Sequence, residues 1–370
     1  MKVLHFILGR ADPNTSNGVN KVIAGHAKYG IKHGHHVTVI GLSSSQKKDY
    51  ELIERDGFNV HSYRLFFSGA FRKIRELSHS VDLIHLHSVW NNYNLIVGFY
   101  AKINAIPYII TAHSGLTDDR LKQSNYFLKW LYHSIFQKKL YDSAAGVHAL
   151  TNEESSCLRK YIGNNNIFVV ENGVESAHKY CNLENAHDKF KIGFLGRLAK
   201  EKNVKSLLMS LVELPDNIKN KIQVILIGPA EINYKKELDS ILNEHDLDSL
   251  VEYRGALYGT EKLEALLSLD CYIHPAFSDV VSIAVMEAFS LGLPSIITRT
   301  SDVSYYYNSG AFIMVEPDCQ SISNGIRLFV QSPEKHKSMS ESAISLANNI
   351  FNWDVVIPKL FSEYEKLIHS

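Results

Sequence analysis

Residues 274–288 read HPAFSDVVSIAVMEA and carry two carboxylates eight positions apart, Asp279 and Glu287. A β-rich run, residues 271–274, comes directly before the two acids. The apolar residues between the acids suit a loop that runs into the N-terminus of a helix. We therefore expect a strand, a loop and a helix in succession here, with both carboxylates turned toward one cleft.

The same alternation of short β-rich runs with helical stretches extends along the chain on both sides of this segment. In the second half the β-rich runs are residues 190–195, 223–227, 251–253, 271–274 and 295–298. In the first half they are residues 3–8, 37–42, 60–65, 83–87, 108–112, 146–149 and 167–170. Strands that alternate with helices predict an α/β protein whose parallel sheets are covered on both faces.

The length of the chain predicts two domains, because one hydrophobic core stops growing at about 250–300 residues and this chain has 370. We expect a first domain at residues 1–175, a polar linker at 176–188, a second domain at 189–352 and a C-terminal helix at 353–370. Two doubly wound domains that face one another place a central cleft at the C-terminal ends of their strands, where ligands of such sheets bind.

The composition describes a globular protein that does not span a membrane. Apolar residues make up 45% of the chain and charged residues 21%. No apolar run approaches the ~20 residues that cross a bilayer, and the first ten residues read as a strand and not as a signal peptide. We therefore expect a cytoplasmic protein.

The four cysteines of the chain lie far apart without metal-ligand spacing, so we expect reduced thiols and no metal site.

Charge is distributed unevenly, although the net charge is zero. Residues 1–185 hold 21 Lys and Arg against 15 Asp and Glu, and residues 186–370 hold 18 against 24. A basic first half suits anionic lipid headgroups or a phosphorylated acceptor, and ordinary surface scatter is an equal alternative. Residues 66–75 and 126–139 mix bases with aromatic residues, as lipid-interface segments do. We expect 126–139 to be a helix with its rings in the core, and the first stretch stays open.

Basic residues follow the first strand of the second half. The segment GFLGRLAKEKN, residues 193–203, places Gly196, Arg197 and Lys202 between a strand and a helix. The guanidinium fork and the ammonium point charge can together neutralise a diphosphate leaving group. Solvated surface bases are the alternative.

The acidic segment at 274–288 can bind the remaining parts of a nucleoside diphosphate sugar. Asp279 would accept hydrogen bonds from the hydroxyls of a hexose, and Glu287 would take a ribose diol. The backbone N–H groups that would hold the diphosphate are those of Val280, Val281, Ser282 and Ile283. A solvated loop acid and a helix-face glutamate are the structural alternative.

Further candidates lie at the ends of other strands. Asn17 and Gly18 end the loop after the first strand and open a helix, where their N–H groups would approach the ligand. His113 follows the strand at 108–112 and would hydrogen-bond a sugar hydroxyl. His85 and His87 fall on one side of the strand at 83–87, where a role in the core is the more common one.

The last candidate ligand-binding residues follow the strand at 251–253. Arg254 and Leu257 would supply backbone contacts to a nucleobase edge, and tight turns are the structural alternative. The chain has no GxGxxG suited to a dinucleotide and no GxSxG elbow, so neither dinucleotide binding nor covalent hydrolase chemistry is supported.

Taken together, these segments resemble the retaining glycosyltransferases of family 4, which have the two-domain GT-B fold. The resemblance covers almost the whole chain and rests on the order and spacing of the motifs, from the first glycine-containing loop to the helix that begins at Trp353. It implies that Glu287 binds ribose, that Arg197 and Lys202 bind the diphosphate, and that His113 contacts the donor sugar. It also implies that the C-terminal helix crosses back to the first domain.

The sequence departs from the family pattern at four places. Asp279 stands where the family usually has Glu, and Val280 and Ser282 replace the two glycines that commonly follow it. Asn203 replaces the glycine after Glu-Lys, and Asn17 with Gly18 replaces the usual pair of glycines in the first loop. Asp279 is one methylene shorter than Glu, so it would reach a different sugar hydroxyl.

The resemblance implies a metal-independent transferase, without a cofactor, that retains the anomeric configuration. It would move a hexose from a UDP- or GDP-sugar to a hydroxyl of a glycan or lipid-linked oligosaccharide, in the synthesis of cell-surface polysaccharide. On the basis of its positive charge, the first domain would contact the inner face of the cell membrane, and no nucleic acid is expected as a partner. Two alternatives stay open: a catalytically weak scaffold subunit, and a GT-B sugar-nucleotide epimerase or hydrolase that turns over without an acceptor.

Overall fold

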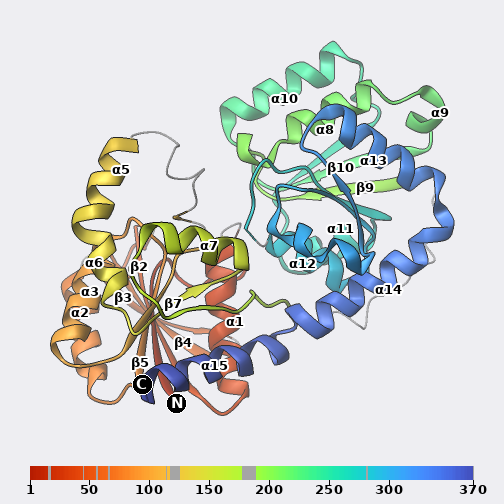
Figure 1. The fold of residues 1–370 in the computed structure, drawn as a ribbon. Helices are drawn as coiled ribbons and strands as arrows, with labels where there is room; N and C mark the ends of the chain where they lie inside the picture. The colour runs from red at the N-terminus through yellow and green to blue at the C-terminus, as the bar shows by residue number, and fades with distance from the viewer. Residues whose placement is uncertain are drawn as a thin grey trace. The chain divides into compact units, whose positions relative to one another are not determined.

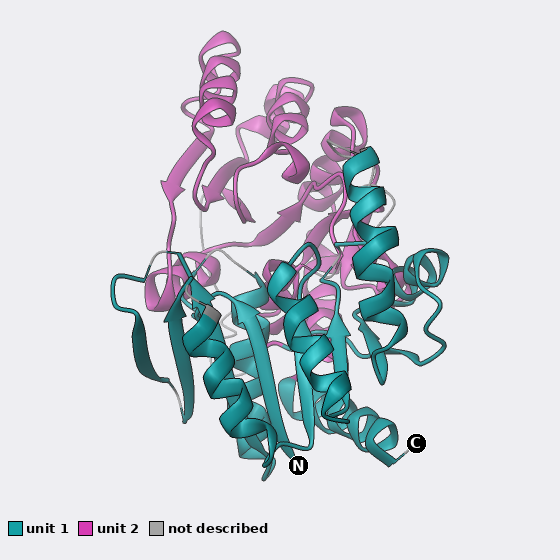
Figure 2. Cartoon of the chain, turned by 90° about the vertical axis from the view of Figure 1, so that its left-hand side faces the viewer, with its two compact units in different colours: residues 1–173, 353–370 teal, residues 174–352 magenta. Residues whose placement is uncertain are grey.

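The computed structural model describes residues 1–15, 18–44, 46–55, 57–65, 67–113, 115–116, 126–176, 189–280 and 282–369 (Figure 1). The chain divides into two compact units, unit 1 formed by residues 1–173 and 353–370, and unit 2 formed by residues 174–352 (Figure 2). The linker expected at 176–188 lies, apart from Ser176, outside the described residues.

Unit 1 is built on an eight-stranded sheet in the order β3-β4-β2-β1-β5-β6-β7-β8. The strands are β1 (Lys2–Leu8), β2 (His36–Ser43), β3 (Tyr50–Arg55), β4 (Phe58–Arg64), β5 (Leu83–His87), β6 (Tyr108–Thr111), β7 (Gly146–Ala149) and β8 (Ile167–Val169). All neighbours pair in parallel except β3 and β4, which are antiparallel. No strand was predicted from the sequence at β3, which pairs antiparallel with β4 because the link between them is too short for the crossover that parallel strands need.

Helices lie on both faces of this sheet (Figure 1). They are α1 (Gly18–Lys32), α2 (Phe67–Ser78), α3 (Asn92–Ile103), α5 (Tyr126–Tyr132), the π-helical η1 (His133–Gln137), α6 (Lys138–Asp142), α7 (Asn152–Tyr161) and α15 (Trp353–His369). Side chains of α2, α3 and α6 share one core cluster with β1, β5 and β6. In α2, Ile74 is buried in that cluster while Arg72 and Arg75 are exposed, as in an ordinary amphipathic surface helix.

The C-terminal helix α15 is part of unit 1 and packs along α1. Its first residue, Trp353, lies against Gly25 of α1 and Gly173 at the end of the first segment. A Cβ atom added to Gly25 would lie 2.1 Å from the indole ring, and one added to Gly173 would lie 2.2 Å from it. Only glycine leaves room for the ring at both positions.

Unit 2 is built on a six-stranded parallel sheet in the order β11-β10-β9-β12-β13-β14. The strands are β9 (Phe190–Leu195), β10 (Ile222–Ile227), β11 (Val251–Gly255), β12 (Cys271–His274), β13 (Ser295–Thr298) and β14 (Phe312–Val315). Five of them match the expected β-rich runs. Strand β14 was not predicted, because its four residues at the sheet edge give too short an apolar run to distinguish from a helix segment.

Helices also cover both faces of the unit 2 sheet, with α8, α10 and α13 on one side and α11 and α12 on the other (Figure 1). The α-helices are α8 (Val204–Val212), α9 (Asp216–Lys219), α10 (Ile232–Glu244), α11 (Gly259–Leu267), α12 (Ile283–Ser290), α13 (Cys319–Gln331) and α14 (His336–Leu346). Shorter helical segments are η2 (Lys200–Lys202), η3 (Asp302–Ser309), η4 (Pro333–Lys335) and η5 (Ala347–Phe351). The main core packs α8, α10 and α13 onto β9, β10 and β12.

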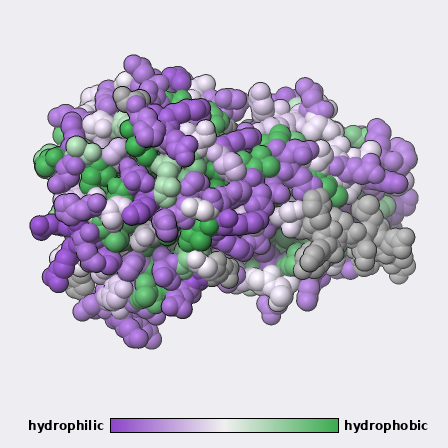
Figure 3. All heavy atoms as spheres, turned by 90° about the horizontal axis from the view of Figure 1, so that it is seen from below, coloured by the Kyte–Doolittle hydropathy of each residue, from purple (hydrophilic) through white to green (hydrophobic). Residues whose placement is uncertain are grey.

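No helix among the described residues is long and apolar enough to cross a membrane. On the face shown in Figure 3, hydrophobic residues form small separate groups among hydrophilic ones. Cys271 and Cys319 are free thiols, and Cys181 lies outside the described residues.

Candidate active site

The strand order of unit 2 reverses between β9 and β12, which are hydrogen-bonded neighbours. From β9 the chain proceeds to β10 and β11 on one side, and from β12 to β13 and β14 on the other. Loops that leave such a pair of strands diverge and open a crevice at their C-terminal ends. Arg197 and Lys202 follow β9 and Asp279 follows β12, so the topology brings these three candidates to one switch point.

Glycines allow the loop after β9 to start close to β10. A Cβ atom at Gly228 would lie 1.9 Å from the carbonyl oxygen of Gly196, so the two backbones can approach only without a side chain. Beyond Gly196, the buried Leu198 forms a bridge with Ala230. These contacts fix the path of the loop that carries the basic residues.

Asn203 joins three loops at the entrance of α8. Its backbone is left-handed, with φ of 55°, a conformation that asparagine tolerates better than most residues. Its buried side-chain amide donates hydrogen bonds to the carbonyl oxygens of Pro275 and Pro317, each 2.9 Å long. Asparagine in place of the family's glycine therefore keeps the backbone conformation and adds two bonds that tie the loop after β9 to the loop after β12.

Lys202, Asp279 and His274 form a compact charged group beside Asn203. The Lys202 ammonium pairs with Asp279 Oδ2, and His274 Nε2 lies 3.0 Å from the same oxygen. The Lys202 and Asp279 side chains are 21% and 18% exposed, whereas the His274 side chain is 1% exposed. The site therefore holds its carboxylate largely out of water and against two side-chain nitrogens.

The surroundings of Asp279 keep it ionised. Burial by itself raises the pKa of Asp279, but the charge of Lys202 and the hydrogen bond from His274 outweigh that effect and lower the pKa below its usual value. Burial also lowers the pKa of His274, although Asp279 opposes that shift. The carboxylate therefore stays charged at neutral pH.

Glu287 lies on α12 and pairs with a residue that the sequence analysis missed. Its Oε1 atom accepts a hydrogen bond of 2.8 Å from the Nζ atom of Lys262 on α11. The two side chains are 16% and 20% exposed. No local motif marks Lys262, because its helix lies 25 residues earlier in the chain than Glu287 and meets α12 only in the fold.

The acidic segment has the strand, loop and helix that its sequence predicted, β12 followed by a loop and α12. Asp279 lies in the loop, where its carbonyl oxygen accepts a bond of 3.0 Å from the N–H group of Asp302. Ser282 is the N-cap residue and makes no side-chain hydrogen bond to the first turn, which starts at Ile283. Val280 is half-buried beside them, and Val281 lies outside the described residues.

Arg197 and Arg254 do not contact this charged group. Arg197 is exposed, and it pairs with Glu201 and with Glu231, whose Oε1 atom lies 3.5 Å from Nη1. Arg254 at the end of β11 forms bonds of 2.7 and 3.2 Å to Glu252, two residues away. Leu257, just after β11, is half-buried.

The unit 1 candidates lie at the ends of β1 and β6. Gly18 is the first residue of α1, and Asn17 lies outside the described residues. His113 follows β6 in a left-handed conformation, with φ of 48°, and its Nε2 atom lies 3.0 Å from Nδ1 of His87. Its ring is therefore oriented from within the unit by a second histidine.

His85 and His87 lie on the same side of β5, as alternation predicted, with ring centroids 3.9 Å apart. Both are buried, and their rings meet those of His5 on β1 and His26 on α1. This group was not predicted from the sequence, because its members come from three elements whose association only the fold reveals.

Family models cover nearly the whole chain. Residues 16–178 match the model described as Glycosyltransferase Family 4, and residues 181–346 match the model described as Glycosyl transferases group 1. The chain belongs to glycosyltransferase family 4.

Individual relatives are distant. The uncharacterized glycosyltransferase MJ1069 of Methanocaldococcus jannaschii is 21% identical over 326 residues, which cover 84% of this chain and 80% of that protein. The GDP-mannose-dependent alpha-mannosyltransferase of Corynebacterium glutamicum is 25% identical over 182 residues, which cover 48% of this chain and 40% of that protein.

Solved structures confirm the GT-B fold that the sequence predicted. The crystal structure of Anabaena Alr3699/HepE in complex with UDP aligns with a TM-score of 0.77 at 16% identity. The alignment covers 99% of this family 4 chain and 100% of that one.

Proposed function

We propose that this protein moves a hexose from a UDP- or GDP-sugar to a hydroxyl of a glycan or lipid-linked oligosaccharide, with retention at the anomeric carbon and without a metal ion at the donor. The observation that carries the proposal is the Lys202–Asp279–His274 group at the switch point of unit 2, with Glu287 on the following helix. The match to a UDP-bound structure supports a nucleoside diphosphate donor.

Each residue has a place on the donor. Glu287, held by Lys262, accepts hydrogen bonds from the ribose diol, and Asp279 accepts them from the hexose. Lys202 turns from Asp279 to the diphosphate, and Arg197 exchanges its exposed partners for the same group. The first turn of α12 adds backbone N–H groups and the positive end of its dipole.

Catalysis then consists of stabilising the leaving group. As the bond between the anomeric carbon and the diphosphate breaks, negative charge grows on the phosphate oxygens, and Lys202 and Arg197 neutralise it in place of a metal ion. The acceptor hydroxyl attacks the sugar cation from the face that the diphosphate leaves, and a diphosphate oxygen takes the hydroxyl proton. His113 contacts the sugar hydroxyls.

Replacing Glu287 with alanine is expected to weaken donor binding about tenfold to 100-fold, because a hydrogen bond to a charged group contributes about 1.5–3 kcal/mol. The measurement is calorimetry with a panel of UDP- and GDP-sugars. Glu334→Ala, which changes an exposed glutamate of the same unit, serves as the control. Equal affinity of the Glu287 and Glu334 variants would remove Glu287 from the donor site.

The same panel separates the proposal from its alternatives. A chain that binds none of the donors is a scaffold and not a transferase, and one that converts the donor without an acceptor is an epimerase or hydrolase. Proton NMR of the product, formed without added divalent cations, tests both retention and metal independence. An inverted anomeric configuration would contradict the retaining mechanism.

We also propose that unit 1 contacts the inner face of the cell membrane through an apolar surface on α3, α5 and η1. Its exposed side chains are Ile96, Phe99, Ile103, Phe127, Leu128, Trp130, Leu131, Ile135 and Phe136.

Our expectation that 126–139 buries its rings is wrong, because almost every residue of α5 is apolar and one helix cannot turn all of them inward. Lys102 of α3 and Lys139 of α6 are exposed, and lysines suit anionic headgroups.

Vesicle sedimentation tests the membrane contact. The protein is expected to pellet with vesicles of anionic phospholipid, and the double variant Phe127→Ser/Trp130→Ser is expected to bind at least about tenfold more weakly, because each exposed ring buries apolar area in the interface. Tyr305→Ser, at an exposed tyrosine of unit 2, is the control. Wild-type protein that remains in the supernatant would contradict this contact.

A further inference from the structure

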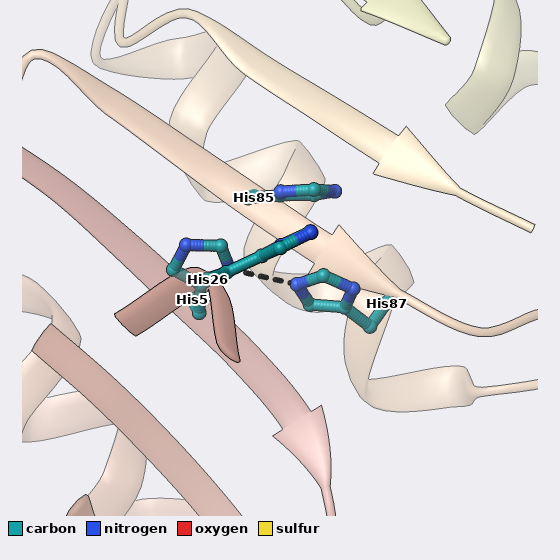
Figure 4. Close-up of side chains that lie close together, drawn as sticks. All are labelled: His5, His26, His85 and His87. Atoms are coloured by element: carbon teal, nitrogen blue, oxygen red, sulfur yellow. Dashed lines mark hydrogen bonds between the residues drawn. The ribbon is translucent and has the colours of Figure 1, made fainter. Parts of the chain in front are cut away.

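Four buried histidines of unit 1 converge on one point (Figure 4). They are His5 on β1, His26 on α1, and His85 and His87 on β5. Each is at most 1% exposed. Each offers one ring nitrogen to a set in which all four nitrogens lie within 4.8 Å of one another.

The hydrogen bonds of the group leave several ring nitrogens without a partner. His87 is satisfied at both nitrogens, by His5 Nδ1 at 2.8 Å and by His113. His85 is satisfied by the Tyr364 hydroxyl at 2.8 Å and the Thr111 hydroxyl at 2.6 Å. By contrast, His5 Nε2 and both nitrogens of His26 have no hydrogen-bond partner.

Unpartnered nitrogens at this depth need a physical explanation. A buried polar atom without a hydrogen bond costs about 1–3 kcal/mol, and native proteins contain few of them. Three such atoms in two adjacent rings indicate that something else occupies the bonding directions of these rings. Because the unpartnered atoms belong to imidazoles that face two further imidazoles, a metal ion fits the donor set.

We propose that His5, His26, His85 and His87 form a buried binding site for a single first-row transition-metal ion of the zinc class. Zinc–imidazole bonds are about 2.0–2.1 Å long, so the ligand atoms of a tetrahedral site lie about 3.4 Å apart. The four ligand atoms therefore need to approach one another by about 1.4 Å at most to reach that geometry.

Contacts outside the group orient two of the ligands. The Tyr364 hydroxyl of α15 lies against Nδ1 of His85, and His113 lies against Nδ1 of His87. An ion at this point replaces the His5–His87 hydrogen bond and the bond between His85 Nε2 and the Thr111 hydroxyl. The proton shared between His5 and His87 moves to a ring nitrogen that does not face the ion, so all four imidazoles stay neutral. The hydrogen bonds to Tyr364 and His113 remain. Such outer hydrogen bonds are the usual means by which proteins fix the tautomer and direction of metal-binding histidines.

The donor set also selects the class of ion. Neutral imidazoles suit Zn²⁺, Co²⁺, Ni²⁺ and Cu²⁺, whereas Mg²⁺ and Ca²⁺ require oxygen ligands. The ligands come from β1, α1 and β5, so the ion would join the first helix of unit 1 to the centre of its sheet. This role is structural, and it is separate from the metal-independent chemistry proposed for unit 2.

Metal titration of the full chain tests the site. Tag-free protein is stripped with a chelator, dialysed and titrated with Co²⁺ and then with Zn²⁺. We expect one equivalent per chain, visible absorption bands typical of tetrahedral Co²⁺, their loss when Zn²⁺ is added, and a melting temperature that rises with the metal concentration. A wild-type chain that binds less than a stoichiometric amount overturns the proposal.

Variants locate the binding. His26→Ala is expected to abolish Co²⁺ binding, whereas His79→Ala, at an exposed histidine of the same unit, is expected to leave it unchanged. Tyr364→Phe keeps the shape of the core and is expected to lower the affinity about 10–100-fold with the stoichiometry unchanged, because it removes the bond that orients His85. If Tyr364→Phe binds as tightly as wild type, or if binding survives His26→Ala, the ion lies elsewhere and the proposal fails.

Discussion

Replacing Lys202 with alanine is expected to lower turnover about 10²-fold or more, because Lys202 supplies positive charge where the departing diphosphate becomes negative. The measurement is the steady-state rate with the preferred donor and acceptor. Lys202→Arg keeps the charge and is expected to retain part of the rate. Lys205→Ala, three residues further along, removes an exposed lysine that pairs with Glu237 and serves as the control.

A loss of stability has to be separated from a loss of catalysis in this experiment. Lys202→Ala leaves the Asp279 carboxylate without its cation, and breaking a largely buried pair costs about 3–5 kcal/mol. The double variant Lys202→Met/Asp279→Asn removes both charges, so its melting temperature is expected to recover toward wild type while its turnover stays low. Recovery of turnover together with stability would assign Lys202 a structural role only.

Mild acid is expected to unfold unit 1 when the metal is chelated. Burial lowers the pKa values of His5 and His113 to about 3 and that of His148 to about 4. Below pH 6.5 the unfolded chain takes up protons at these positions and the folded chain does not, so stability is full above pH 6.5 and is lost as the pH falls toward 3. At pH 5 the loss is about 2 kcal/mol for each histidine, or about 6 kcal/mol for the three.

A loss of this size is comparable with the whole stability of a typical domain, which is about 5–15 kcal/mol. Circular dichroism melts in EDTA at pH 7.5 and pH 5 provide the measurement. His148→Gln is expected to reduce the fall in melting temperature between pH 7.5 and pH 5, even if it lowers the melting temperature at pH 7.5. His245→Gln, at an exposed histidine of unit 2, is expected to leave the pH dependence unchanged. Melting temperatures that do not fall between pH 7.5 and pH 5 would contradict the prediction.

The sequence predicted the parts of the site that are local in the chain. The segment at 274–288 indicated a strand end, a loop and a helix start, and the structure has β12, that loop and α12 in these places. Period-two and period-3.6 patterns are properties of single elements, so they can be recognised in the sequence alone. The family resemblance then supplied roles for Lys202, Asp279 and Glu287, which stay predictions until the variants are measured.

The partners of these residues could not be predicted in the same way. Lys262 reaches Glu287 from another helix, and Lys202 reaches Asp279 from the loop after β9. Each pairing depends on the packing of elements whose association the sequence does not reveal. Asn203 was visible as a departure from the family pattern, but only its left-handed backbone and its bonds to Pro275 and Pro317 explain why asparagine serves there.

The position of α15 has a consequence for the order in which the chain folds during synthesis. Unit 2 is continuous in sequence, so it can complete its core as soon as Asn352 has left the ribosome. Unit 1 cannot, because Trp353 fills the space beside Gly25 and Gly173, and Tyr364 closes over His85. The half of the protein that is translated first is therefore finished last, and until then its histidine-lined interior is open to water, to protons and to any ion that it will later enclose.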